Sequence, residues 1–348
     1  MRDPEGTLEF DGSTACRRLH KALDAGHFLR RPEAARMVTD GLLTPYAIAD
    51  DRRIDVRRLP FVSYPYEWID SQLWSAAELT LEVLRRAAEA GWELKDATGF
   101  NVIFRGTRPE FCDHLSFAPI ARREWWAYGQ FIRHFIAPLA ISRQSGLPAA
   151  RTHRGGLDGL AVDAARRMLG PRRWFHRSGF ALIEHRTGVH RGRMNHRPGG
   201  SPLHAGLHRF LCWQLDGLVP KSRQTAWSDY ESDRIHYSPS SLAEKRSTVT
   251  RWLDTIRPQR VLDLGCNQGE FSALALAHAT QVICVDADSE SLEALWHRFK
   301  DDERVHPVLA SLDDPSEARG WRGREFTSLV DRLRAQAGRV RDRDRNRR

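Results

Sequence analysis

The chain has 348 residues, of which 41% are hydrophobic, a net charge of +9 and five cysteines. This length predicts about two domains with real hydrophobic cores. The cysteines stand singly and no apolar run approaches roughly 18 residues, so we expect no disulfide framework, no zinc ribbon and no membrane span, and we predict a reducing, cytoplasmic compartment.

Residues 1–59 are charged and weakly periodic. We treat them as a short N-terminal segment that contains a helix ending near Gly41. Residues 60–66, PFVSYPY, predict a short strand, and residues 71–90 predict a long amphipathic helix. Gly91 suits the C-terminal cap of this helix. Together these elements open a mainly α-helical domain, which we place at residues 60–215.

Residues 93–117, ELKDATGFNVIFRGTRPEFCDHLSF, carry a first group of candidate site residues. Asp96 and Asn101 have the D-x-x-x-x-N spacing of a kinase catalytic loop, residues 102–112 predict a hairpin, and Asp113 follows it. This order resembles the C-lobe of protein kinases, and the resemblance implies a phosphotransfer site at these three residues.

The segment also departs from the kinase pattern. Asp113 is followed by His114-Leu115 in place of Phe-Gly, and neither a glycine-rich loop nor a phosphate-pairing lysine precedes it. We therefore expect a degenerate kinase-like lobe with a small β hairpin. The alternative is that Asp96 and Asn101 only cap their own loop.

Between this segment and residue 256 the sequence predicts helices and a linker. Residues 122–139 predict an aromatic helix in which Trp125 and Trp126 are buried. Residues 216–240 predict a linker. Ser241 and Glu244 form a capping-box signal for a helix to about residue 256. No metal site is predicted, because the histidines have no third ligand at a recognisable spacing.

Residues 260–288, RVLDLGCNQGEFSALALAHATQVICVDAD, predict a strand, a glycine loop, a helix and a second strand. This is half of a doubly wound α/β fold, in which ligands bind at the carboxyl ends of the strands. Asp263 would repel a pyrophosphate and attract an ammonium group. Asp286 ends the second strand, where a carboxylate can accept both hydroxyls of a ribose. The alternative is the same unit with no ligand.

The motif DLGCNQGEFS, followed by VICVDAD, resembles motif I and the acidic motif of class I S-adenosylmethionine-dependent methyltransferases. Asp263, Gly265 and Gly269 match the family pattern D-x-G-x-G-x-G, and Asn267 replaces the central glycine. The resemblance implies that S-adenosyl-L-methionine is the cofactor and that seven residues contact it: Asp263, Gly265, Asn267, Gly269, Asp286, Ala287 and Ser311.

Three further stretches, PFVSYPYEW, LKDATGFNVIF and TAWSDYES, extend the resemblance to a family of bacterial methyltransferase-domain proteins that includes a host-specific nodulation protein. This resemblance covers residues 61–321. It implies a methyltransferase and leaves the methyl acceptor open.

The remaining sequence predicts a third strand at residues 305–309 and a last helix at residues 324–336. Ser311 stands where the family carries an acidic residue near the adenine. The resemblance implies a seven-stranded sheet in the order 3-2-1-4-5-7-6, of which residues 241–335 supply a Rossmann-like α/β part with strands 1–3 only. The first strand is then expected at an edge, which the N-terminal domain, a helix at residues 326–333 or a second copy of the chain could cover.

Ten arginines and four acids lie between residue 321 and residue 348. We predict that residues 336–348 form a solvated tail and that nucleic acid is not a partner, because no stacked aromatics or nucleic-acid motif accompanies this charge.

Three functions remain open from the sequence. The first is a methyltransferase of unknown acceptor whose activity is reduced by the missing strands, and no catalytic base can be named for it. The second is a non-catalytic cofactor-binding or scaffold protein. The third is a phosphotransferase that uses the kinase-like lobe.

Overall fold

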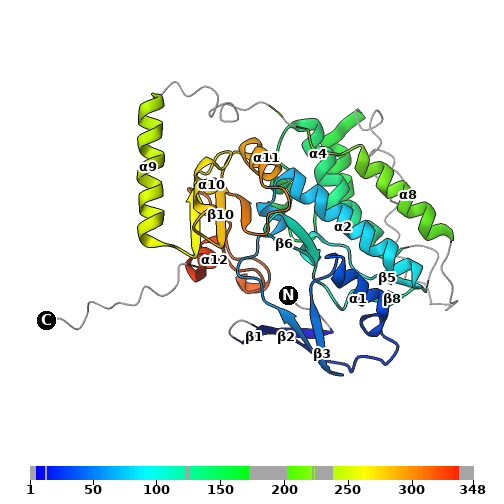
Figure 1. The fold of residues 1–348 in the computed structure, drawn as a ribbon. Helices are drawn as coiled ribbons and strands as arrows, with labels where there is room; N and C mark the ends of the chain where they lie inside the picture. Colours follow the sequence, from blue (N-terminus) through cyan, green and yellow to red (C-terminus); the bar gives the residue numbers. More distant parts are fainter. Residues whose placement is uncertain are drawn as a thin grey trace.

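The computed structural model describes residues 5–11, 14–121, 125–171, 202–221, 223 and 238–336. In these ranges the chain is a mixed α/β protein with four small sheets, and the helices of its middle part lie to one side of the N-terminal strands and of the C-terminal sheet (Figure 1). No helix of the described residues is long and apolar enough to cross a membrane.

The N-terminal residues form a four-stranded antiparallel sheet that the sequence analysis did not predict. Its strand order is β1-β2-β4-β3. The elements of this part are β1 (Gly6–Asp11), β2 (Thr14–Leu19), η1 (Phe28–Arg30), α1 (Pro32–Thr39), β3 (Tyr46–Asp50) and β4 (Arg53–Arg57). Arginines occupy several positions of these short strands, and Ala15, Leu19 and Ile54 are the buried hydrophobic side chains in them. The alternation of apolar and polar residues is therefore too weak to predict these four strands from the sequence.

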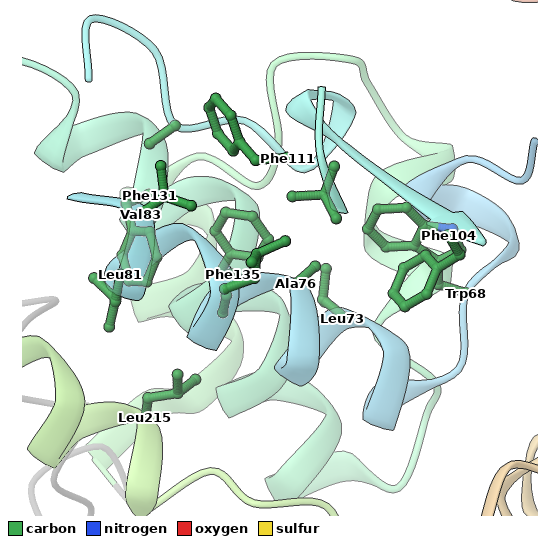
Figure 2. Close-up of a cluster of buried hydrophobic side chains, with 14 of the residues drawn as sticks. Trp68, Leu73, Ala76, Leu81, Val83, Phe104, Phe111, Phe131, Phe135 and Leu215 are labelled. Atoms are coloured by element: carbon green, nitrogen blue, oxygen red, sulfur yellow. The ribbon is translucent and has the colours of Figure 1, made fainter. Parts of the chain in front are cut away.

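The helical body is built around α2 (Asp70–Glu89), close to the predicted bounds 71–90. Figure 2 shows its buried side chains, among them Leu73 and Ala76, meeting aromatic rings from other elements. Those elements are β5 (Trp92–Leu94), η3 (Gly99–Asn101), β6 (Val102–Arg105), β7 (Arg108–Phe111), β8 (Phe117–Pro119), α3 (Tyr128–Phe131), η4 (Ile132–Ile136, a π-helical turn), α4 (Ala137–Ser145), α5 (Ala150–Arg154), α6 (Val162–Leu169) and α8 (Pro202–Asp216).

Two expectations for this body are wrong and one is confirmed. Residues 60–66 form no strand. Pro65 instead begins the 3-10 turn η2 (Pro65–Glu67), which is held because the Glu67 carboxylate accepts the Tyr64 backbone N–H at 3.0 Å. Trp126 is 62% exposed, whereas Trp125 is buried as expected. The hairpin is confirmed as β6 and β7, paired antiparallel from Val102 with Phe111 onward.

The C-terminal part contains a parallel three-stranded sheet in the order β11-β10-β9. Its strands β9 (Arg260–Leu264), β10 (Gln281–Asp286) and β11 (Val305–Leu309) agree with the predicted bounds. Its helices are α9 (Pro239–Ile256), α10 (Glu270–Leu276), α11 (Ser289–Arg298) and α12 (Leu329–Gln336), and η6 (Trp321–Gly323) precedes α12. The predicted capping box is wrong, because Ser238 caps α9 by accepting the Ser241 N–H at 3.1 Å.

One face of this sheet is only partly covered. Ile283 and Val285 of β10 are buried under Phe61 and Leu329. The register places Leu262 and Leu264 of β9 beside Ile283 and Val285 on the same face. These two leucines are nevertheless 44% and 49% exposed. Within the described residues β9 is thus an edge strand with an uncovered apolar face, as the sequence predicts.

The C-terminal sheet is joined closely to the helical body. Phe104 of β6 meets Trp296 of α11 edge to face, with ring centroids 5.8 Å apart. The Thr107 hydroxyl donates to the Phe299 carbonyl at 3.1 Å, and the Thr107 backbone N–H donates to the Asp302 carbonyl at 3.1 Å. A single continuous group of buried side chains spans both parts.

Candidate functional site

The loop between β9 and α10 has the backbone geometry that the glycine motif predicts. Gly265, Asn267 and Gly269 all have positive φ, at 70°, 48° and 81°. Asparagine is one of the few non-glycine residues that adopts this conformation readily. The replacement of the central glycine by Asn267 therefore leaves the loop geometry intact.

The two glycines of this loop serve different purposes. A Cβ on Gly265 would meet no atom within 4 Å, so the backbone there faces open space. A Cβ on Gly269 would lie 2.8 Å from the Phe299 ring and 3.0 Å from Leu295. Gly265 therefore leaves room for a ligand, whereas Gly269 allows the loop to pack against α11 and the residue after it.

Asp286 ends β10 and holds the glycine loop. One carboxylate oxygen accepts the Asn267 N–H at 2.8 Å, and the other accepts the Asp288 N–H at 2.9 Å. Asp288 in turn caps α11 by accepting the Ser291 N–H at 2.8 Å. Each carboxylate oxygen of Asp286 keeps further lone pairs, because an ionised carboxylate offers about four acceptor sites.

Asp263 lies one strand away from Asp286. Its carboxylate accepts the Ser272 hydroxyl at 2.7 Å. Burial raises the pKa of Asp263, and the nearby Asp286 carboxylate adds to this effect, while the Ser272 hydrogen bond opposes it. A cationic ligand beside Asp263 would lower that pKa again, because an opposite charge favours the ionised form.

A small cavity of about 40 Å³ is lined by Ala287, the residue that follows Asp286, whereas Asp263 and Asp286 themselves are not among its lining residues. The C-terminal sheet contributes Ala287, Leu309, Ala310 and Ser311 to its lining. The helical body contributes the other five lining residues, Tyr66, Pro148, Ala150, Arg151 and Arg154. The cavity therefore lies between the two parts of the chain, at the carboxyl ends of β10 and β11.

The sequence analysis found one side of this cavity and missed the other. Ala287 and Ser311 were both predicted as site residues, and both line this cavity. Tyr66 belongs to the stretch PFVSYPYEW, which was noted only for its resemblance, and nothing in the spacing of Arg151 or Arg154 signals a site. The Ser311 hydroxyl donates to the Asp313 carboxylate, so an acidic group does stand near the end of β11.

The first group of candidate site residues, Asp96, Asn101 and Asp113, is held by contacts within the fold. Asn101 donates its side-chain N–H to the Asp96 carbonyl at 3.2 Å, and the Asp96 carboxylate accepts the Gln130 side chain at 3.0 Å. Asp113 forms an ion pair with Arg17 of β2 at 2.8 Å. These contacts are those of residues that fix their own loops and join the helical body to the N-terminal sheet.

No group of three or more His, Cys, Asp or Glu side chains is arranged to hold a metal ion within the described ranges. The donor set around the β9–α10 loop instead suits an organic cation with hydroxyl groups. Asp263 and Asp286 supply negative charge, and Gly265 leaves space for close approach.

Comparison with known proteins gives one informative match. No family model matches the chain. The chain is similar to the nodulation protein NoeA of Rhizobium meliloti (strain 1021), with 30% identity over 292 residues. The match covers 79% of this chain and 61% of NoeA, so the chain spans about three fifths of the length of that relative.

Proposed function

We propose that the chain binds S-adenosyl-L-methionine at the carboxyl ends of β9, β10 and β11 and that it is a methyltransferase. Asp286 is the observation that carries the proposal. It ends the second parallel strand, it holds the glycine loop through Asn267, and it keeps lone pairs for the two hydroxyls of a ribose. The similarity to NoeA is consistent with a methyltransferase-like role.

Six of the seven predicted residues have a direct place in this proposal, and the seventh, Gly269, allows the loop to pack against α11. Asp263 faces the positively charged end of the cofactor, and Gly265 with Asn267 leaves the loop backbone accessible. Ala287 and Ser311 flank the adenine end. The cofactor supplies an electrophilic methyl group when bound, and the protein contributes mainly proximity and orientation.

The proposal also includes the architecture. Residues 241–335 would form strands 1–3 of a Rossmann-like methyltransferase sheet, and residues 60–215 a degenerate kinase-like body. The methyl acceptor stays open, because the strands that line the acceptor pocket in complete methyltransferases have no counterpart in the described residues. A non-catalytic cofactor-binding or scaffold protein is the alternative, and turnover of a methyl donor separates the two.

Titration calorimetry with S-adenosyl-L-methionine tests the site. We expect Asp286→Ala to weaken binding by about 1.5–3 kcal/mol, because charge-assisted hydrogen bonds are lost. Asp163→Ala is the matched control, since Asp163 lies on α6 with its side chain 69% exposed. A folded Asp286→Ala variant with wild-type affinity would contradict the cofactor assignment.

A further inference from the structure

We infer that Tyr66, which comes from the helical body and not from the sheet, supplies the hydrogen bond that recognises the purine of the cofactor. This inference rests on the proposed function and deepens it. It assigns adenine selectivity to a residue about 200 positions before the glycine motif in the sequence.

Tyr66 has an unsatisfied hydroxyl. The residue is 1% exposed, and its hydroxyl has no hydrogen-bond partner among the described residues. A buried polar group without a partner is costly, and most such groups in folded proteins are paired. A ligand in the cavity that Tyr66 lines would offer the missing partner.

The surroundings of Tyr66 hold its ring in place. The Arg319 guanidinium lies 5.0 Å from the centre of the ring, and the Phe100 ring lies 6.3 Å away. Arg319 is fixed in turn, because it donates to the carbonyls of His153 and Arg154 on α5. Burial raises the pKa of Tyr66 well above its usual range, so the hydroxyl keeps its proton and can both donate and accept.

The hydrogen-bonding groups of adenine are complementary to the Tyr66 hydroxyl. Adenine has an amino group that donates and ring nitrogens that accept, and the Tyr66 hydroxyl can pair with either kind of group. Among the cavity residues from the C-terminal sheet, the Ser311 hydroxyl is already engaged with Asp313. Ser311 is thus a weaker candidate for this contact, although the family resemblance points to its position.

The outer wall of the cavity is adjustable. Arg151 is exposed and has no ion-pair partner in the described part of the chain, whereas Arg154 is paired with Asp314 at 2.7 Å. A purine needs more space than the cavity now offers, so entry of the ligand requires a side chain to move. The exposed Arg151 can swing outward at low cost, while Tyr66 cannot.

The test is Tyr66→Phe, which removes only the hydroxyl. Calorimetry measures the affinity of the full chain for S-adenosyl-L-homocysteine and for its inosine counterpart, in which a carbonyl replaces the amino group. We expect Tyr66→Phe to bind the adenosine ligand about tenfold more weakly and to discriminate less between the two ligands. Tyr64→Phe is the matched control, because Tyr64 is a nearby tyrosine that does not line the cavity.

A second readout separates binding from structure. Since the hydroxyl is buried and unpartnered, its removal should raise the melting temperature of the ligand-free protein. Weaker binding together with a higher melting temperature supports the inference. Unchanged affinity or unchanged discrimination, in a wild-type protein that binds and in which Asp286→Ala weakens binding, overturns the inference and leaves the proposed function standing. Absence of wild-type binding overturns both.

Discussion

Two histidines in the helical body are buried and neutral, and they contribute to the fold mainly by packing. His134 of η4 and His153 of α5 are each 1% exposed, with ring centroids 5.8 Å apart. His134 Nδ1 and both ring nitrogens of His153 have no hydrogen-bond partner in the described residues. Burial lowers the pKa of His153 to about 4. Burial also holds the pKa of His134 well below its ordinary value, and the nearby His153 and Arg133 add to this effect.

This arrangement predicts acid sensitivity. A histidine whose pKa is lower in the folded protein contributes stability above its unfolded pKa of roughly 6.5, and that stability is lost as the pH falls toward the folded value. We expect His153→Leu to reduce the loss of unfolding free energy between pH 6.5 and pH 4.5 by about 2 kcal/mol. Chemical denaturation at several pH values measures this loss. The exposed His297→Leu should leave the pH profile unchanged, and a wild-type slope in His153→Leu would contradict the expectation.

The residues of the glycine motif show what a sequence can predict at this scale. Gly265, Asn267 and Gly269 take up positive φ as their types suggest, and Asp286 lies at the end of its strand. Tyr66 could not be predicted, because its importance comes from a cavity that only the folded chain creates. Asn101 has a local partner in Thr98, whereas the partner of the Asp96 carboxylate, Gln130, lies 34 residues away in the sequence and meets it only through packing.

At the scale of elements, α2 depends on a residue of another helix. Its N-cap residue is Ile69, whose apolar side chain cannot accept a hydrogen bond from the first turn of the helix. The free N–H of Ser71 is accepted instead by the Glu293 carboxylate of α11 at 2.9 Å, and Gln72 accepts the N–H of Ile69 at 3.1 Å. The start of α2 therefore depends on the C-terminal part of the chain.

The contact between Glu293 and Ser71 makes the stability of the protein depend on pH. Burial raises its pKa to about 7, and the Asp70 and Glu290 carboxylates add to the effect, while its hydrogen bonds with Ser71 oppose it. A raised pKa contributes stability that is complete below the unfolded value of roughly 4.5 and is lost as the pH rises through 7.

We expect Glu293→Gln to keep the hydrogen bond from Ser71 and to remove the loss of stability at high pH. At pH 8.5 the variant should be more stable than the wild type by on the order of 2 kcal/mol, and at pH 5 the two should be similar. Thermal unfolding at both pH values checks the expectation. Glu89→Gln, at the exposed end of α2, serves as the control. A variant that is less stable at both pH values would show that Glu293 is needed in its charged form.

Elements with strong local patterns were predicted well, and those without them were not. The three parallel strands, α2 and the β6–β7 hairpin have apolar runs or alternation bounded by clear turn residues. The four N-terminal strands bury one thin face and expose arginines, so they carry no comparable signal. Residues 60–66 contain the aromatic residues of a strand, but Pro65 starts a 3-10 turn in the fold.

At the scale of the whole molecule, the edge of the C-terminal sheet is an apolar surface that the described residues leave open. Leu262 and Leu264 continue the buried face of β10 into solvent, and β9 pairs on one side only within the described residues. Figure 1 shows α9 standing at the outer margin beside this sheet, and Trp252 and Ile256 of α9 are 61% and 71% exposed. An open apolar edge is a template for pairing with another strand.

We propose that a second copy of the chain covers this edge, and we expect concentration-dependent association in sedimentation velocity. The double substitution Leu262→Lys and Leu264→Lys should shift the protein toward the monomer, because charged side chains block edge pairing. Leu147→Lys, at a leucine that is 59% exposed elsewhere, is the matched control. Equal sedimentation of all three proteins would contradict association through β9.

The tip of the β6–β7 hairpin rests directly on the C-terminal part of the chain. A Cβ on Gly106 would lie only 2.2 Å from the Asp302 carbonyl oxygen and 2.4 Å from the Glu303 backbone, and Gly106 has φ of 64°. This close approach of two backbones leaves no space for a side chain at position 106. A hairpin with any other residue at its tip would therefore have to move away from residues 302 and 303, so the contact restricts which hairpins can join this C-terminal part.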